Sequence, residues 1–196
     1  MTNQRKAGHI GSRIQFGPSD EGFKIQISQE IPKAQMAMLT TWLVMWGIVI
    51  IPVIWYGLLA DEFDISSDER IAYLIYSGFW TFFAVRIFKV WRWRRRGSEQ
   101  IVINPSGISV AMLFGSRGLP DTFAHGSFGP MERLRLDPTK FMQTFDHAFW
   151  SLGGATLRFE ARGKHIQFGK QLENKDADAL ASLIQKEVKR ARGATT

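Results

Sequence analysis

Cysteine is absent from all 196 residues, so disulfides, thiolate catalysis and cysteine-ligated metal sites are excluded. The sequence also lacks a GxxxxGK[ST] phosphate loop, a nucleophile elbow and an HExxH zinc pair. His125 lies four residues after Asp121, but this spacing brings two side chains together only on a helix, and the segment contains glycine. We therefore expect a non-catalytic protein with no metal or cofactor of its own.

Charged residues are missing from Ala34 to Ala60, and this absence predicts a membrane span. A helix needs about 20 apolar residues to cross the hydrocarbon layer, so we place the first span at residues 38–60. The start of the chain has no apolar core of signal-peptide type, so we expect the span to be retained as an anchor.

A second span is predicted at residues 71–91. Its uncharged part, Ile71 to Val85, is short, so Arg86 and Lys89 must extend their aliphatic stems toward the interface. The alternative is a buried helix of a soluble protein. The neighbouring span and the flanking charges favour the membrane helix.

The stretch FKVWRWRRRG, residues 88–97, interleaves cations with tryptophan and has two interpretations: a nucleic-acid surface or the end of a membrane helix. Residues 98–196 are nearly balanced, with thirteen cations and ten acids, whereas a nucleic-acid domain would carry a basic face on its folded part. We therefore expect no nucleic-acid partner. The residues predicted at the lipid interface are Arg86, Lys89, Trp91, Arg92, Trp93, Arg94, Arg95 and Arg96.

Orientation follows from where the cations flank the two spans. The connecting loop, residues 61–70, has five acids and one cation, while both outer flanks are rich in Lys and Arg. Because Lys and Arg stay on the cytoplasmic side, both termini are expected in the cytoplasm. The basic strip either recruits anionic phospholipids or only sets this topology, and the sequence does not separate the two.

The spans are rich in aromatic and small residues that favour packing on another helix. Trp42 and Trp46, and Phe79 and Phe83, are four residues apart and so share a helix face. Gly47 and Gly78 permit close approach of helices. These six residues are the predicted contact surface for other integral membrane subunits, with lipid-facing aromatic side chains as the alternative.

Short alternating segments replace the apolar runs after Gly97. We expect strands at residues 99–103 and 107–114 on either side of the turn NPSG, a strand at 131–137, a hairpin at 155–169 that turns at 161–163, and an amphipathic helix at 174–191. Six or seven strands followed by a helix form the layout of a pleckstrin-homology-like (PH-like) β-barrel or sandwich. A further hairpin is expected within residues 13–32, around the turn sequence GPSDEG, and it must dock because an isolated hairpin is marginally stable.

The expected organisation is therefore an α+β membrane protein in three parts. Residues 1–33 form an N-terminal segment with a hairpin, residues 34–97 a transmembrane hairpin, and residues 98–192 the PH-like domain.

The order of GSEQIVINPSGISV, MERLRLD and LRFEARGKHIQFGKQLENKDADALASLI resembles a group of uncharacterised bacterial two-span membrane proteins with a cytoplasmic PH-like domain. The resemblance covers most of the chain from about Gln15 onward. It implies a fold and a location in the bacterial inner membrane, and it supplies no catalytic residue.

Two functions fit these features. The first is a scaffold or accessory subunit that stabilises a larger inner-membrane complex, which could be respiratory, photosynthetic, transport-related or an assembly machine. The second is a PH-like module that senses anionic lipid or another ligand at the cytoplasmic face of the membrane.

Overall fold

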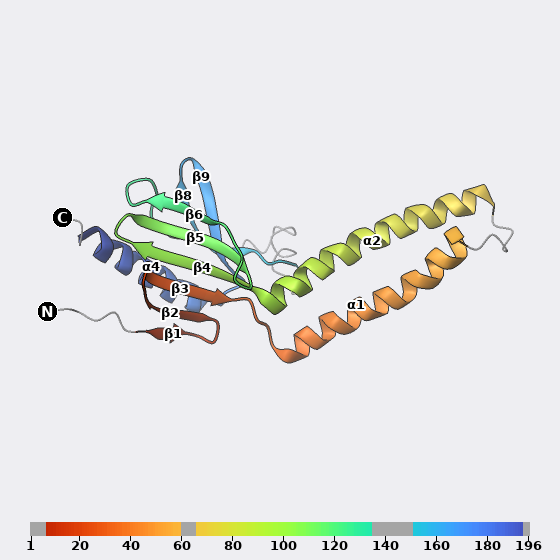
Figure 1. The fold of residues 1–196 in the computed structure, drawn as a ribbon, viewed down its shortest axis with the longest axis horizontal. Helices are drawn as coiled ribbons and strands as arrows, with labels where there is room; N and C mark the ends of the chain where they lie inside the picture. Colours follow the sequence, from red (N-terminus) through yellow and green to blue (C-terminus); the bar gives the residue numbers. More distant parts are fainter. Residues whose placement is uncertain (1–6, 60–65, 135–150, 194–196) are drawn as a thin grey trace. The chain divides into compact units, whose positions relative to one another are not determined.

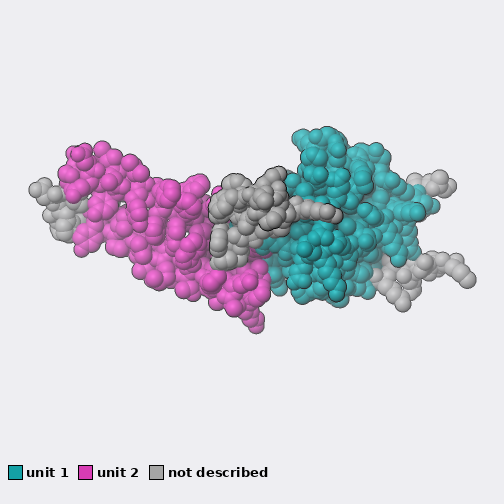
Figure 2. All heavy atoms as spheres, turned by 180° about the vertical axis from the view of Figure 1, so that it is seen from behind, with its two compact units in different colours: residues 1–30, 95–196 teal, residues 31–94 magenta. Residues whose placement is uncertain are grey.

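The computed structural model describes residues 7–59, 66–134 and 151–193 of an α+β protein. The chain divides into two compact units, coloured separately in Figure 2. The helical unit is residues 31–94, and the α+β unit combines residues 1–30 with residues 95–196. The N-terminal strands therefore belong to the same unit as the C-terminal strands.

Two long helices form the helical unit (Figure 1). Helix α1 (Lys33–Ile54) contains Pro52, which lacks an N–H group for the helix ladder, and continues into the π-helical segment η1 (Trp55–Leu59). Helix α2 (Ser67–Arg96) starts at a capping box. The Ser66 backbone N–H donates to the Glu69 carboxylate at 2.9 Å, and the Glu69 N–H donates to the Ser66 hydroxyl at 3.3 Å.

Both helices are long and apolar enough to cross a membrane. Only 6% of the apolar window of α1 and 11% of that of α2 is buried inside the protein, unlike the core helix of a soluble domain. The predicted spans, 38–60 and 71–91, fall on these helices apart from residue 60, which lies outside the described residues. Residues 67–70, expected in the connecting loop, instead form the first turn of α2.

A six-stranded antiparallel sheet organises the α+β unit, with strand order β1-β2-β3-β4-β5-β6. Its strands are β1 (Gly8–Ile10), β2 (Ile14–Ser19), β3 (Gly22–Ser28), β4 (Gly97–Asn104), β5 (Gly107–Phe114) and β6 (Pro120–Ala124). Strands β2 and β3 form the hairpin expected within residues 13–32, and β3 pairs with β4 from Phe23 opposite Ile103 to Ser28 opposite Ser98. The hairpin therefore docks by extending the sheet.

A smaller sheet and one helix complete this unit. Strands β7 (Glu132–Arg133), β8 (Ala155–Ala161) and β9 (Lys164–Lys170) form the three-stranded sheet, and α4 (Asn174–Gly193) follows. The spacing of Leu180, Ile184 and Val188 predicts the buried face of α4 correctly. These side chains join one apolar core with residues of both sheets, including Ile25 of β3 and Phe159 of β8.

The expectation of a β-barrel is wrong for the part of the chain that the structure describes. The strands form two separate sheets, because neither edge strand of the six-stranded sheet, β1 or β6, pairs with β7, β8 or β9. Strand β4, where the expected barrel would begin, is paired on one edge with β3 and on the other with β5. Both edges of β4 are therefore used within the six-stranded sheet, and neither is open for closure with the second sheet.

Candidate functional site

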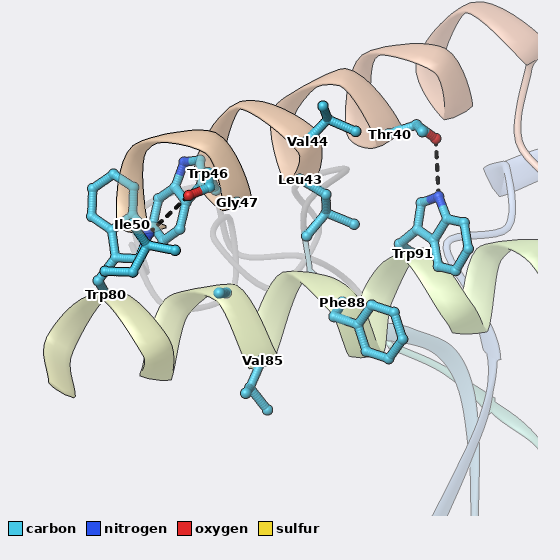
Figure 3. Close-up of a pocket in the computed structure, with 11 residues that line it drawn as sticks. Thr40, Leu43, Val44, Trp46, Gly47, Ile50, Trp80, Val85, Phe88 and Trp91 are labelled. Carbon is cyan, nitrogen blue, oxygen red and sulfur yellow. Dashed lines mark hydrogen bonds between the residues drawn. The ribbon is translucent and has the colours of Figure 1, made fainter. Parts of the chain in front are cut away.

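A groove of about 460 Å³ lies between α1 and α2 (Figure 3). Its lining residues recur at helical spacing, so each helix presents one stripe to the groove. They are Thr40, Leu43, Val44, Trp46, Gly47 and Ile50 from α1, and Trp80, Ala84, Val85, Phe88 and Trp91 from α2. Most of these side chains are apolar, which is the composition of a site for an apolar group.

Two indole hydrogen bonds connect the helices along this groove (Figure 3). The Trp91 Nε1–H donates to the Thr40 hydroxyl at 2.9 Å, and the Trp80 Nε1–H donates to the Trp46 carbonyl oxygen at 3.3 Å. Because both indole donors are used within the hairpin, the two rings offer the groove mainly their apolar surface.

The aromatic pairs expected from four-residue spacing are in contact. The rings of Trp42 and Trp46 have centroids 5.3 Å apart, and those of Phe79 and Phe83 are 4.8 Å apart. Trp46 also stacks on Trp80 of the other helix at 4.3 Å, so it holds the hairpin together. Phe79 is 66% exposed and thus remains available to a partner.

The glycines expected to permit close helix approach do not do so within the hairpin. A Cβ atom added at Gly47 or Gly78 would meet nothing within 4 Å. The close approach occurs instead at Gly57, where a Cβ would lie among atoms of the Tyr73 side chain. Gly57 was not singled out by its sequence context, whereas a role for Gly47 and Gly78 against a partner stays a prediction.

The basic strip divides into exposed and buried members. Trp93 and Arg94 are only 2% exposed, so they are the least accessible of the residues assigned to the lipid interface, and that assignment stays a prediction. Arg94 shares the buried face of α2 with Ile87 and Val90, from which it is spaced by seven and four residues. Trp91 is half-buried. The exposed cations of the strip are Arg86, Lys89, Arg92, Arg95 and Arg96.

A buried polar network in the α+β unit was not predicted from the sequence. The carboxylate of Glu99, 1% exposed, accepts the Gly169 N–H at 2.5 Å, the Lys170 N–H at 3.1 Å and the Gln29 amide N–H at 3.2 Å. The guanidinium of Arg13 donates to the Gln29 side-chain oxygen at 3.1 Å and to the carbonyl oxygens of neighbouring segments.

This network connects the N-terminal hairpin to both sheets. Burial raises the pKa of Glu99, opposed by the N–H groups of Gly169 and Lys170 and by the positive charges of Lys170 and Arg13. Burial lowers the pKa of Arg13, because it disfavours the charged form of the guanidinium just as it disfavours the charged form of the carboxyl group. Every partner is part of the fold, so we assign the network a structural role.

The histidine considered for acid–base or metal chemistry has another partner. A ring nitrogen of His125, Nε2, lies 2.8 Å from the carbonyl oxygen of Asn104. Among the described residues, no group of three or more His, Asp or Glu side chains is arranged to hold a metal ion. The candidate site is therefore the groove between α1 and α2 with the exposed cations that follow it.

No family model, no curated protein and no solved structure matches this chain. The functional argument consequently rests on the residues themselves.

Proposed function

We propose that this protein is a non-catalytic, membrane-anchored scaffold or accessory subunit of a larger complex in the bacterial inner membrane. The observation that carries the proposal is the exposed aromatic surface of the two helices. Phe79 is 66% exposed, Phe82 60% and Trp55 60%. Large aromatic rings at a surface are typical anchors of protein interfaces.

The proposed orientation places both termini in the cytoplasm. Strand β3 ends five residues before α1 begins, and β4 begins directly after α2. Because β3 and β4 pair, the chain must leave the α+β unit and return to the same side of the membrane. Together with the cations that flank the helices, this pairing supports a cytoplasmic α+β unit.

We regard that unit as PH-like, because six strands, β4 to β9, precede its C-terminal helix.

The decisive experiment is to tag the C-terminus, solubilise native membranes in a mild detergent and identify the proteins recovered in stoichiometric amount. A defined set of integral membrane subunits is the expected result. Recovery of the protein alone would contradict the scaffold role.

Replacing Phe79 and Phe82 with Ala should reduce the recovery of the integral membrane subunits that co-purify with the protein. Truncating an interface anchor costs about 2 kcal/mol, and both side chains are exposed on α2. The measurement is the partner-to-bait ratio by quantitative mass spectrometry. Phe114→Ala, which removes an exposed ring from β5, is the matched control and should leave the ratio unchanged.

A second candidate function is the sensing of anionic lipid. Lys89, Arg92 and Arg96 are exposed on α2 at spacings of three and four residues, so they share one face. Each cation next to a membrane attracts anionic headgroups by about 1 kcal/mol.

For this sensor, replacing Arg92, Arg95 and Arg96 with Gln should remove the salt-sensitive part of phosphatidylglycerol binding by the detergent-solubilised protein. Salt acts because exposed charges are screened beyond about 10 Å at 0.1 M. Arg94 is left unchanged because it is buried. Binding that stays equally tight and equally salt-sensitive in the triple variant would eliminate the sensor.

A further inference from the structure

We propose that the groove between α1 and α2 is a binding site for one anionic phospholipid, with an acyl chain along the groove and the phosphate at its basic end. This inference rests on the proposed membrane location, and it names a ligand for the groove. It is carried by the arrangement of apolar and charged residues along the same two helix faces.

The volume and lining of the groove suit an acyl chain. Its volume of about 460 Å³ is within the range of sites for small molecules, about 300–1,000 Å³. The polar groups closest to it, the hydroxyl of Thr40 and the indole N–H groups of Trp80 and Trp91, are already hydrogen-bonded within the hairpin. A ligand in the groove therefore gains apolar contact and displaces no polar partner.

Cations continue the groove at one end. On α2, Arg92 follows the lining residue Phe88 by four positions, and Lys89 follows Val85 by four. On α1, Lys33 precedes the lining residue Thr40 by seven positions, or two helical turns. All three cations are exposed.

The sequence of apolar and then charged residues along the two helices indicates the class of ligand. An apolar stripe that ends in cations on both helices matches an amphiphile with a long hydrocarbon chain and a negatively charged head. A membrane supplies such a molecule as an anionic phospholipid at high local concentration. A zwitterionic phospholipid would fill the groove equally well but would gain less from the cations.

The first test fills the groove. The full-length protein is purified in detergent, incubated with palmitoyl-oleoyl phosphatidylglycerol or phosphatidylcholine, and analysed by native mass spectrometry. Gly47→Leu should abolish retention of one phosphatidylglycerol per chain, because Gly47 lines the groove and has space for a side chain. Gly78→Leu is the matched control, since Gly78 also has space around it and does not line the groove.

The second test removes the charge. Lys89→Gln with Arg92→Gln should weaken phosphatidylglycerol binding by roughly 30-fold, from about five-fold for each cation. Arg70→Gln with Lys164→Gln removes the same charge at two exposed positions outside the candidate site and should change binding little. Equal retention in all variants, or equal retention of both lipids, would overturn the proposal, because either result indicates only a non-specific lipid shell.

The tests separate this inference from the proposed function. A protein that resists alkaline extraction from membranes but retains no phosphatidylglycerol would refute the lipid site and leave the anchor intact. A protein released by alkaline extraction would refute both. Co-purifying partners are measured independently of bound lipid, so their absence would remove only the scaffold role.

Discussion

Replacing Glu99 with Ala should lower the free energy of unfolding of the α+β unit by about 3–5 kcal/mol, the cost of breaking a buried charged network by removing one partner. The substitution removes the acceptor of three N–H groups, from Gly169, Lys170 and Gln29. It also leaves the largely buried guanidinium of Arg13 without the nearby negative charge of Glu99. A loss of this size is a large fraction of the 5–15 kcal/mol typical of a whole domain.

Amide hydrogen exchange of the full-length protein in detergent measures this loss, because protection of the β4 and β8 amides reports opening of the whole unit. Glu21→Ala, which removes an exposed carboxylate between β2 and β3, is the matched control. Protection in Glu99→Ala equal to that in Glu21→Ala would show that the network adds no stability.

The same carboxyl group makes stability depend on pH. Burial raises the pKa of Glu99 in the folded protein, so the folded state holds this proton more tightly than the unfolded state. The contribution of Glu99 to stability therefore decreases as the pH rises from the ordinary glutamate pKa through the raised value. This part of the pH dependence should be absent in Glu99→Ala.

Phe159→Ala should also cost about 3–5 kcal/mol, through the cavity that it leaves in the core. The ring of Phe159 is fully buried and lies 5.5 Å from that of Phe123, 5.6 Å from Phe128 and 6.0 Å from Phe168, measured between centroids. Phe123 belongs to the six-stranded sheet and Phe168 to the three-stranded sheet. The substitution therefore removes a contact that holds the two sheets together.

Two comparisons make this result specific. Phe159→Leu keeps most of the side-chain volume and should cost under about 1.5 kcal/mol. Phe114→Ala removes an exposed ring and should have a small effect on the same exchange measurement. If Phe159→Ala destabilised the unit no more than Phe114→Ala, the core assignment of Phe159 would be wrong.

Local patterns predicted the elements that depend on nearby residues. The apolar spacing in α4 and the turn sequences between β4 and β5 and between β8 and β9 gave helices and strands close to their observed bounds. The charge-free run beginning at Ala34 similarly located α1. These features follow from helical or strand periodicity, which a sequence shows directly.

Contacts between distant residues were not visible in the sequence. The pairing of β3 with β4 joins residues 70 to 80 positions apart, and it produces an open six-stranded sheet where a barrel was expected. Glu99, Gln29 and Arg13 likewise come from three separate segments, and no local spacing indicates their contact. In the helical unit, Gly57 and Gly47 have similar surroundings in sequence, and only the structure shows which one is in close contact with another helix.

The pairing of β3 with β4 also sets an order of events during translation. The first three strands leave the ribosome before either helix, and β3 has no β4 to pair with until about 70 further residues have been made. At about 5–20 residues per second, this delay is roughly 4–14 seconds. A completed six-stranded sheet therefore exists only in chains whose two helices have already been synthesised.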